Sequence, residues 1–208
     1  MLNPLRLALL GSSNGTNMLH LIEAIKQQHV NASIEVVLSN KADAPILARA
    51  RDNNLKAICL DNINKTRETF DTTLSETLQK FNIDLIILIG YMRILSPLFV
   101  ATWQNRIINV HPSLLPAFSG MMDRKVHEAV LAAGVNESGC TVHFVTEVID
   151  SGPIIIQKTC SVGADDTVDT LKAKVQSLEG EALIEAIQKI KKVYYESNYQ
   201  ASINFCCQ

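Results

Sequence analysis

The sequence lacks the features that indicate a membrane protein or a nucleic-acid-binding protein. Its 208 residues contain no apolar run of about 18 residues, the length at which a membrane-spanning helix is expected. The net charge is −2, so bulk electrostatic attraction to nucleic acid or to an anionic membrane surface is absent. We therefore expect no nucleic-acid partner and no membrane association. The short apolar run near the amino terminus is better explained as a first strand than as a signal peptide.

Cysteine is scarce, and its spacing fits neither a disulfide framework nor a metal site. Five cysteines occur: Cys59, Cys140, Cys160, Cys206 and Cys207. None forms a CxxC pair accompanied by a second pair or by histidine at ligand spacing. This odd, scattered set favours reduced thiols and a cytoplasmic location, and we expect no bound metal. We interpret the terminal Cys206–Cys207 pair as part of a frayed tail rather than as a reactive site.

The composition of the sequence is that of an ordinary globular protein, and its organisation is that of a single domain. Apolar residues make up 47% and charged residues 19%, as in soluble domains with a sizeable core. The chain shows no internal repeat, low-complexity tract or linker. We therefore predict a single domain over residues 1–208.

Short apolar runs alternate with segments of helical periodicity along most of the chain. We expect strands at 5–10, 32–39, 56–60, 84–90 and 106–110. The helices expected between and after them are 17–28, 44–54, 66–81, 96–103 and 123–134. This order predicts an α/β fold with a doubly wound, mostly parallel sheet and helices on both faces.

The pattern changes in the C-terminal part, where strand follows strand. The runs at 140–145 and 153–161 predict an antiparallel addition to the sheet. A long helix is expected over 166–192, with Asp166 or Thr167 as its capping residue.

The stretch "INVHPSLLP" (108–116) places two polar side chains at the end of an apolar strand. Successive side chains of a strand point to opposite faces, so Asn109 and His111 are predicted to project to the same side. Pro112 ends the strand. Ligands bind at the carboxyl ends of strands in open α/β sheets, which makes this a candidate site. A third polar group, Asp150, lies in the turn "EVIDSGP" (147–153) between two later strands.

Together these three residue types suit acyl transfer. An amide can donate to a developing oxyanion, an imidazole can move protons, and a nearby carboxylate raises the pKa of that imidazole. Each residue alone has an ordinary structural explanation: a bulge for Asn109, a satisfied core histidine for His111 and a common turn for Asp150. No Ser or Cys has the setting of a nucleophile, which favours direct transfer to a bound acceptor.

The loop "LLGSSNGTNML" (9–19) joins the first strand to the first helix and carries Gly11 and Gly15. It matches neither GxGxxG nor the P-loop pattern, so it favours a single phosphate over a dinucleotide. The alternative from the residues alone is a plain turn in which Asn14 and Thr16 only cap the helix.

Four motifs give the chain a resemblance to a known family. They are "NVHPSLLP" (109–116), "TVHFV" (141–145) with "DSGP" (150–153), "GYMRILSP" (90–97) and "SNKADAP" (39–45). They resemble the 10-formyltetrahydrofolate-dependent formyltransferase family, whose Rossmann-like fold is then expected over about residues 5–190. The loop "SNGTN" (13–17) is similar to the phosphate-binding loop of members that act on glycinamide ribonucleotide.

The resemblance implies an enzyme that transfers the formyl group of 10-formyltetrahydrofolate to the amine of glycinamide ribonucleotide in de novo purine biosynthesis. It implies Asn109, His111 and Asp150 as catalytic residues. Both substrates are small molecules, no metal takes part, and a monomer or homodimer is expected.

The resemblance also implies binding residues. The substrate phosphate is assigned to Gly15, Thr16 and Asn17, and the substrate's amino end to Glu179. The folate is assigned to Arg67, Met92, Arg93, Ile94, Leu95 and Asn109. Ordinary alternatives are a core position for Ile94 and Leu95 and an exposed position for Arg67 and Glu179.

The sequence departs from the family in three places, one of which is Ser13, where glycine is common. The segment "FSGMMDRKVHEAV" (118–130) is longer than the family's usual motif, so no role is assigned to His127, and the conformation of the 117–126 loop is left open. Gly180 follows Glu179 where the family often has histidine.

Other functions with the same centre are a formyltetrahydrofolate deformylase, a methionyl-tRNA formyltransferase and a sugar-nucleotide formyltransferase. The first carries an additional amino-terminal domain and the second a basic carboxyl-terminal domain, and we expect neither here. A non-catalytic phosphate-binding module is the alternative outside enzymes.

Overall fold

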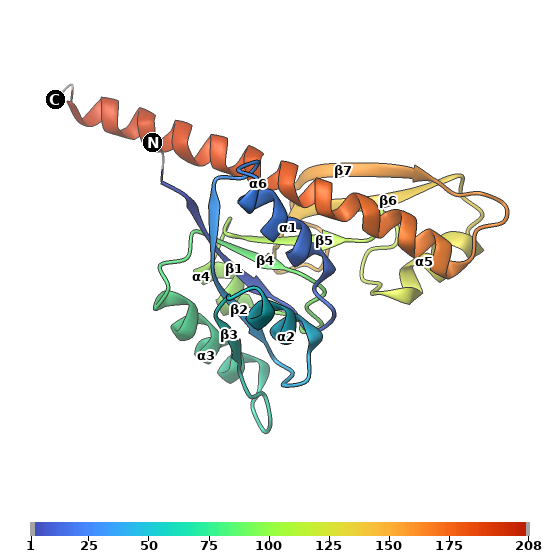
Figure 1. The fold of residues 1–208 in the computed structure, drawn as a ribbon, viewed down its shortest axis with the longest axis horizontal. Coiled ribbons are helices and arrows are strands. Elements are labelled where there is room, and N and C mark those ends of the chain that lie inside the picture. The colour runs from blue at the N-terminus through green and yellow to red at the C-terminus, as the bar shows by residue number, and fades with distance from the viewer. Residues whose placement is uncertain (1–2, 207–208) are drawn as a thin grey trace.

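The computed structural model describes the backbone of residues 3–206 and the side chains of residues 3–193 (Figure 1). The prediction of a frayed tail at Cys206–Cys207 concerns side chains outside that range. The amino-terminal elements are β1 (Leu5–Leu10), α1 (Thr16–Lys26), β2 (Ala32–Ser39), α2 (Pro45–Asp52), β3 (Ala57–Cys59), α3 (Arg67–Gln79) and β4 (Leu85–Leu88). They are followed by α4 (Pro97–Thr102), β5 (Ile107–His111), α5 (Arg124–Ala132), β6 (Glu137–Phe144), β7 (Ile154–Ser161) and α6 (Val168–Cys206).

The strands form one seven-stranded sheet in the order β3-β2-β1-β4-β5-β6-β7. The pairs among β1 to β5 are parallel, and β6 and β7 are added antiparallel. The predicted doubly wound, mostly parallel sheet with an antiparallel addition is therefore confirmed. Because the strand order reverses between β1 and β4, a ligand crevice is expected at the carboxyl ends of these two strands.

Side-chain alternation along the central strands separates two apolar cores. In β1, Leu7 and Leu9 belong to one core, whereas Ala8 and Leu10 belong to the other. The first core packs under α1, α2, α5 and α6, and the second under α3 and α4. A strand covered on both faces needs apolar residues at every position, which explains the continuous apolar runs in the sequence.

The long carboxyl-terminal helix α6 lies across α1, β6 and β7, and its end projects beyond the sheet (Figure 1). Its start is capped as predicted, because the Thr170 amide donates to the Thr167 hydroxyl at 3.2 Å. The helix continues to Cys206, past the predicted end at 192. Gly180 brings α6 close to α1, since a Cβ there would lie 2.1 Å from the His20 Nδ1. Among the described residues, no helix is long and apolar enough to cross a membrane.

Candidate active site

A cavity of about 470 Å³ opens at the carboxyl ends of β1, β4 and β5. The segments 12–17, 88–95 and 109–112 form its inner wall. Its outer side is formed by residues 121–123, by the loop after β6 and by one face of α6. This position is the strand-order reversal at which the fold predicts ligand binding. Of the predicted site residues, all but Arg67 line the cavity.

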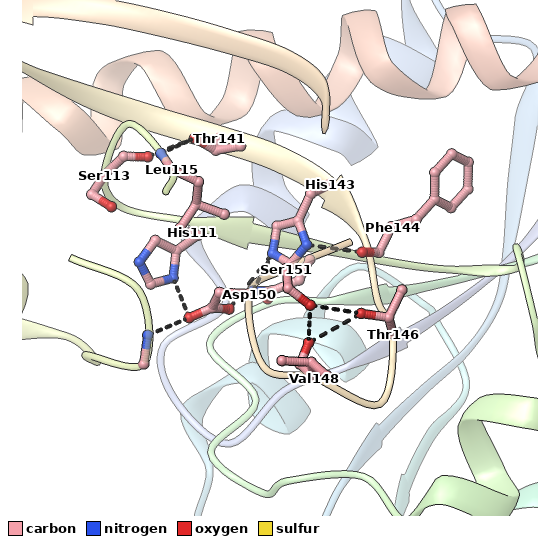
Figure 2. A network of polar contacts seen from close by, with 12 residues as sticks. His111, Ser113, Leu115, Thr141, His143, Phe144, Thr146, Val148, Asp150 and Ser151 are labelled. Atoms are coloured by element: carbon pink, nitrogen blue, oxygen red, sulfur yellow. Dashed lines mark hydrogen bonds and ion pairs between the residues drawn. The ribbon is translucent and has the colours of Figure 1, made fainter. Parts of the chain in front are cut away.

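The three residues predicted to act together do meet in this cavity. Asn109 and His111 project from β5, two residues apart, and Asp150 follows β6 in the chain. The Asp150 Oδ2 lies 3.3 Å from the His111 Nδ1 and also accepts the Gly120 amide at 2.8 Å (Figure 2). Asp150 has a left-handed backbone with φ of 52°, which is costly for a residue with a side chain and is common where function fixes geometry.

Burial dominates the protonation of His111. Its side chain is almost fully buried, and this lowers the pKa of His111 below its usual value. The Asp150 carboxylate and the Phe118 carbonyl oppose that change. The expectation that Asp150 raises the pKa of His111 is confirmed for the contribution of Asp150. The net pKa is nevertheless lowered, because desolvation disfavours the charged ring more strongly.

The contacts of His111 nevertheless suit a proton shared with Asp150. The ring Nε2 lies 3.3 Å from the Phe118 carbonyl oxygen, which can only accept. With a hydrogen on Nε2, the neutral ring would turn a lone pair on Nδ1 toward the Asp150 carboxylate. That lone pair and the carboxylate would repel each other. A proton between the His111 Nδ1 and the Asp150 Oδ2 removes this repulsion. The distance of 3.3 Å between the His111 Nδ1 and the Asp150 Oδ2 is compatible with a single proton between the two atoms.

The sequence pattern assigns no role to His143. The antiparallel register of β5 and β6 places His143 opposite Asn109. Its Nε2 lies 3.3 Å from the Asn109 Nδ2 and 3.7 Å from the Asp150 Oδ1. The "TVHFV" motif contained this residue, but only the pairing of the two strands brings it to the cavity.

The glycine-bearing loop starts α1 in a way that leaves its amides available. Gly15 precedes the helix with φ of 68°, and no side chain caps the helix start. The alternative in which Asn14 and Thr16 only cap the helix is therefore not observed. The first turn also lacks an acidic residue. Uncapped amides and the helix dipole favour an anion at Gly15, Thr16 and Asn17.

The segment 88–95 is joined tightly to that loop. The Ser12 hydroxyl donates to the Asn40 Oδ1 at 2.6 Å and accepts the Met92 amide at 3.0 Å. Gly90 has φ of 57°, and a Cβ there would lie 2.2 Å from the Ser13 Oγ. The Arg93 guanidinium stacks over the Phe70 ring at 4.2 Å. The Ser12 hydrogen bond and the close approach of Gly90 to Ser13 hold this backbone against the glycine loop, whereas the Arg93 side chain is held on α3.

Arg67 is placed differently from the other predicted folate residues. It is exposed at the start of α3, pairs with Glu68 at 3.2 Å and does not line the cavity. Met92, Arg93, Ile94 and Leu95 all line the cavity, and Leu95 is also part of the second core.

Glu179 lines the cavity from α6 and is partly buried rather than exposed. Its Oε2 accepts the Asn17 Nδ2 at 2.8 Å, which joins α6 to the start of α1. Burial raises the pKa of Glu179, and the Asn17 hydrogen bond opposes this. Its position therefore suits recognition of a polar or cationic group at that end of the cavity.

The lengthened segment after β5 reaches the same cavity. Met121, Met122 and Asp123 line it, and Lys172 of α6 pairs with Asp123 at 2.6 Å. His127 is buried and also lines the cavity, and its Nδ1 has no hydrogen-bond partner among the described residues. The altered motif thus contributes to the site directly. It also provides the Gly120 amide, which donates a hydrogen bond to Asp150.

Comparison with known sequences gives one consistent family. The formyl transferase pattern matches residues 5–187. The trifunctional purine biosynthetic protein adenosine-3 of Bos taurus is 40% identical over 186 residues, which are 89% of this chain and 18% of that protein. The phosphoribosylglycinamide formyltransferase of Escherichia coli K12 is 38% identical over 176 residues, which are 84% of this chain and 82% of that protein. The chain therefore spans less than a fifth of the first relative and most of the second.

Solved structures of similar proteins share the fold closely. A glycinamide ribonucleotide transformylase 1 from Symbiobacterium toebii matches with a TM-score of 0.85 and 38% identity, covering 88% of this chain and 86% of that one. The phosphoribosylglycinamide formyltransferase from Coxiella burnetii, solved in complex with CHES, matches with a TM-score of 0.82 and 39% identity. That match covers 89% of this chain and 86% of the other.

Proposed function

The chain belongs to the formyl transferase family, and we propose that it transfers the formyl group of 10-formyltetrahydrofolate to the amine of glycinamide ribonucleotide, a step of de novo purine biosynthesis. The main support for this proposal is that a phosphate-binding helix start and a set of acyl-transfer side chains line the same cavity. An uncapped helix start at Gly15 suits a phosphate, and Asn109, His111 and Asp150 suit acyl transfer.

The two substrates are assigned to different parts of the cavity. The ribonucleotide phosphate binds the amides of Gly15, Thr16 and Asn17, and Glu179 holds the amino end of that substrate. The folate binds along Met92, Arg93, Ile94, Leu95 and Asn109, where the fixed backbone of this segment offers hydrogen-bonding groups. Arg67 is a folate contact only if its exposed side chain turns toward the cavity mouth when folate binds.

The reaction proceeds by direct attack without a covalent enzyme intermediate. The amine nitrogen forms a bond to the formyl carbon, and the carbonyl oxygen becomes negatively charged. The Asn109 amide and the protonated His111 stabilise this oxyanion. The carbon–N10 bond then breaks. The proton lost by the amine passes through the His111–Asp150 pair, directly or by way of water, to N10 of tetrahydrofolate.

Several properties of the protein follow from this proposal. All the residues named come from one chain, so a monomer or a homodimer can carry the reaction, with both substrates as small molecules. We place the enzyme in the cytoplasm, which is supported by the free thiols of Cys59, Cys140 and Cys160. No metal ion is needed in this mechanism.

The test uses purified protein with 10-formyltetrahydrofolate and glycinamide ribonucleotide. We expect tetrahydrofolate and formylated ribonucleotide to appear in equal amounts, and no turnover when the ribonucleotide is omitted. Formate release without the ribonucleotide would identify a deformylase instead. Turnover only with an amino-sugar nucleotide would identify a sugar-nucleotide formyltransferase, and binding of phosphate without any turnover would leave a non-catalytic module.

A further inference from the structure

His143 lies between two of the three catalytic groups and is itself almost fully buried. Its Nδ1 lies 2.9 Å from the Phe144 main-chain carbonyl oxygen, and its Nε2 faces the side chains of Asn109 and Asp150. Figure 2 shows the ring between Phe144 on one side and Asp150 on the other. Both ring nitrogens are therefore engaged, and the roles that they take can be worked out.

The hydrogen on the ring is placed by the Phe144 carbonyl. A carbonyl oxygen only accepts, so Nδ1 must carry the hydrogen in this contact. Burial, the largest influence, lowers the pKa of His143 and favours the neutral ring. In the neutral ring Nε2 then bears a lone pair and accepts a hydrogen bond. The group that can donate to it is the Asn109 Nδ2, at 3.3 Å.

This hydrogen bond decides which way the Asn109 amide points. The oxygen and nitrogen of an asparagine side chain have nearly the same shape, so packing alone hardly distinguishes the two orientations. An acceptor at Nε2 admits the nitrogen and rejects the oxygen. The nitrogen is thereby kept on the His143 side. Its second hydrogen is left to donate to the formyl oxygen as that oxygen becomes negative. A turned amide would present its own oxygen there and repel that charge.

We propose that His143 is a positioning residue, whose neutral Nδ1–H form holds the Asn109 amide with its nitrogen toward the developing oxyanion. This inference rests on the proposed function. Protonation of His143 would reverse the arrangement, because Nε2–H would donate toward the Asp150 Oδ1 and displace the Asn109 nitrogen. The two titratable groups that influence His143 act in opposite senses, since Asp150 favours its protonation and His111 opposes it.

Two substitutions of His143 separate orientation from packing. His143→Phe keeps a buried ring but removes the acceptor, and we expect kcat to fall about 10- to 100-fold with the KM of the ribonucleotide unchanged. This is less than the cost of about 10²- to 10³-fold for removing an oxyanion donor altogether, because Asn109 is still present but no longer oriented. His143→Gln supplies a carbonyl acceptor that does not titrate. We expect it to retain most of the turnover at neutral pH and to lose less of it as the pH is lowered than the wild type does.

A double-mutant cycle with Asn109→Ala tests whether His143 acts through Asn109. Adding His143→Phe to Asn109→Ala is expected to slow turnover no further, because the group to be oriented is already gone. Full additivity of the two effects would overturn the proposal. So would a His143→Gln variant that matches His143→Phe in both kcat and pH profile. His29→Gln, on the exposed turn before β2, is the control and should change neither quantity.

A measurement on the wild-type protein keeps the test independent of turnover and of variant folding. The side-chain amide signals of Asn109 in a ¹⁵N–¹H spectrum are expected to move with the same midpoint pH as the ring signals of His143. Signals of Asn109 that do not respond to the titration of His143 would overturn the proposal. Absence of formyl transfer in the wild type would count against the proposed function alone, because this spectrum needs no substrate.

Discussion

The two walls of the cavity are built from different chemistry. The wall after β1 and β4 combines main-chain groups with small residues of the glycine loop and larger side chains of the 88–95 segment, and its backbone is held by Gly15, Gly90 and the Ser12 hydroxyl. The wall from β5, β6 and the loop at Asp150 offers side chains that gain and lose protons. The first wall depends on backbone geometry and is insensitive to pH, whereas the second depends on where protons lie. Substitutions in the first wall are therefore expected to affect binding, and substitutions in the second wall are expected to affect turnover and its pH dependence.

The largest effect is expected from Asp150→Asn. This substitution replaces the carboxylate beside His111 by a neutral amide of nearly the same size. Loss of proton transfer should lower kcat by about 10²- to 10⁴-fold. The carboxylate that raises the pKa of His111 is removed, so that pKa falls further and the protonated ring persists only to a lower pH. The alkaline decline of the residual turnover should therefore move to lower pH.

A pH series of initial rates measures this shift. The control is Asp165→Asn, the same change at an exposed position just before α6. If Asp150→Asn were slow at every pH but its profile matched the wild type, Asp150 would not act through the proton on His111.

A smaller effect is expected from Gly90→Ala, which adds a side chain where the 88–95 segment meets the glycine loop. The left-handed φ of 57° and the close approach to Ser13 both oppose a side chain there. We expect a loss of stability of about 1–3 kcal/mol for the strained backbone. The KM of both substrates should rise about tenfold, because the glycine loop and the 88–95 segment are displaced together, while the pH profile keeps its shape.

Gly134→Ala is the matched control for this change. Gly134 follows α5 with φ of 62°, and a Cβ there would meet no atom within 4 Å. Thermal unfolding should show the backbone strain in both variants, but steady-state kinetics should change only for Gly90→Ala. Equal KM values in the two variants would mean that the contact with Ser13 is unrelated to binding.

The smallest effect is expected from Glu179→Gln, at the point where α6 meets the start of α1. A glutamine still accepts the Asn17 Nδ2 but carries no charge, so the KM for the ribonucleotide should rise only about three- to tenfold. Burial raises the pKa of Glu179 in the folded protein. Its contribution to stability is therefore present at acid pH, below the unfolded pKa, and is lost as the pH rises through the raised folded pKa.

Thermal unfolding at pH 4 and pH 8 tests the second part of that prediction. Relative to the wild type, Glu179→Gln should be more stable at pH 8 than at pH 4. Glu181→Gln is the control, because Glu181 is exposed on the same helix and pairs with Lys158. A variant whose relative stability is the same at both pH values would contradict a strained, buried carboxylate at Glu179.

The local pattern of the sequence predicts the parallel half of the fold well and the antiparallel addition less completely. The run at 84–90 is a strand as expected, although β4 ends at Leu88 and the chain turns at Gly90. Strand β6 begins at Glu137, earlier than the predicted residue 140. The early part is held by pairing with β7, where a Cβ on Gly139 would meet the Lys158 carbonyl oxygen. Such pairing is a tertiary effect that local propensity does not contain.

The lack of tertiary information in the sequence pattern also explains which residues of the candidate site could be predicted. Asn109 and His111 could be paired from the sequence because they lie two residues apart on one strand. Asp150 is predicted from its place after a later strand and from the family resemblance. His143 could not be found in this way, because its approach to Asn109 depends on the register of β5 against β6. That register is set by packing of both strands and not by any motif.

The Ser12 hydroxyl ties the glycine loop, Asn40 and the Met92 amide together at a single oxygen atom. The parts of the cavity that we propose for the phosphate and for the folate ring therefore cannot move apart independently. A compound that joins a phosphate group to a folate-like ring through a rigid spacer should bind well over only a narrow range of spacer lengths, and Ser12→Ala should widen that range.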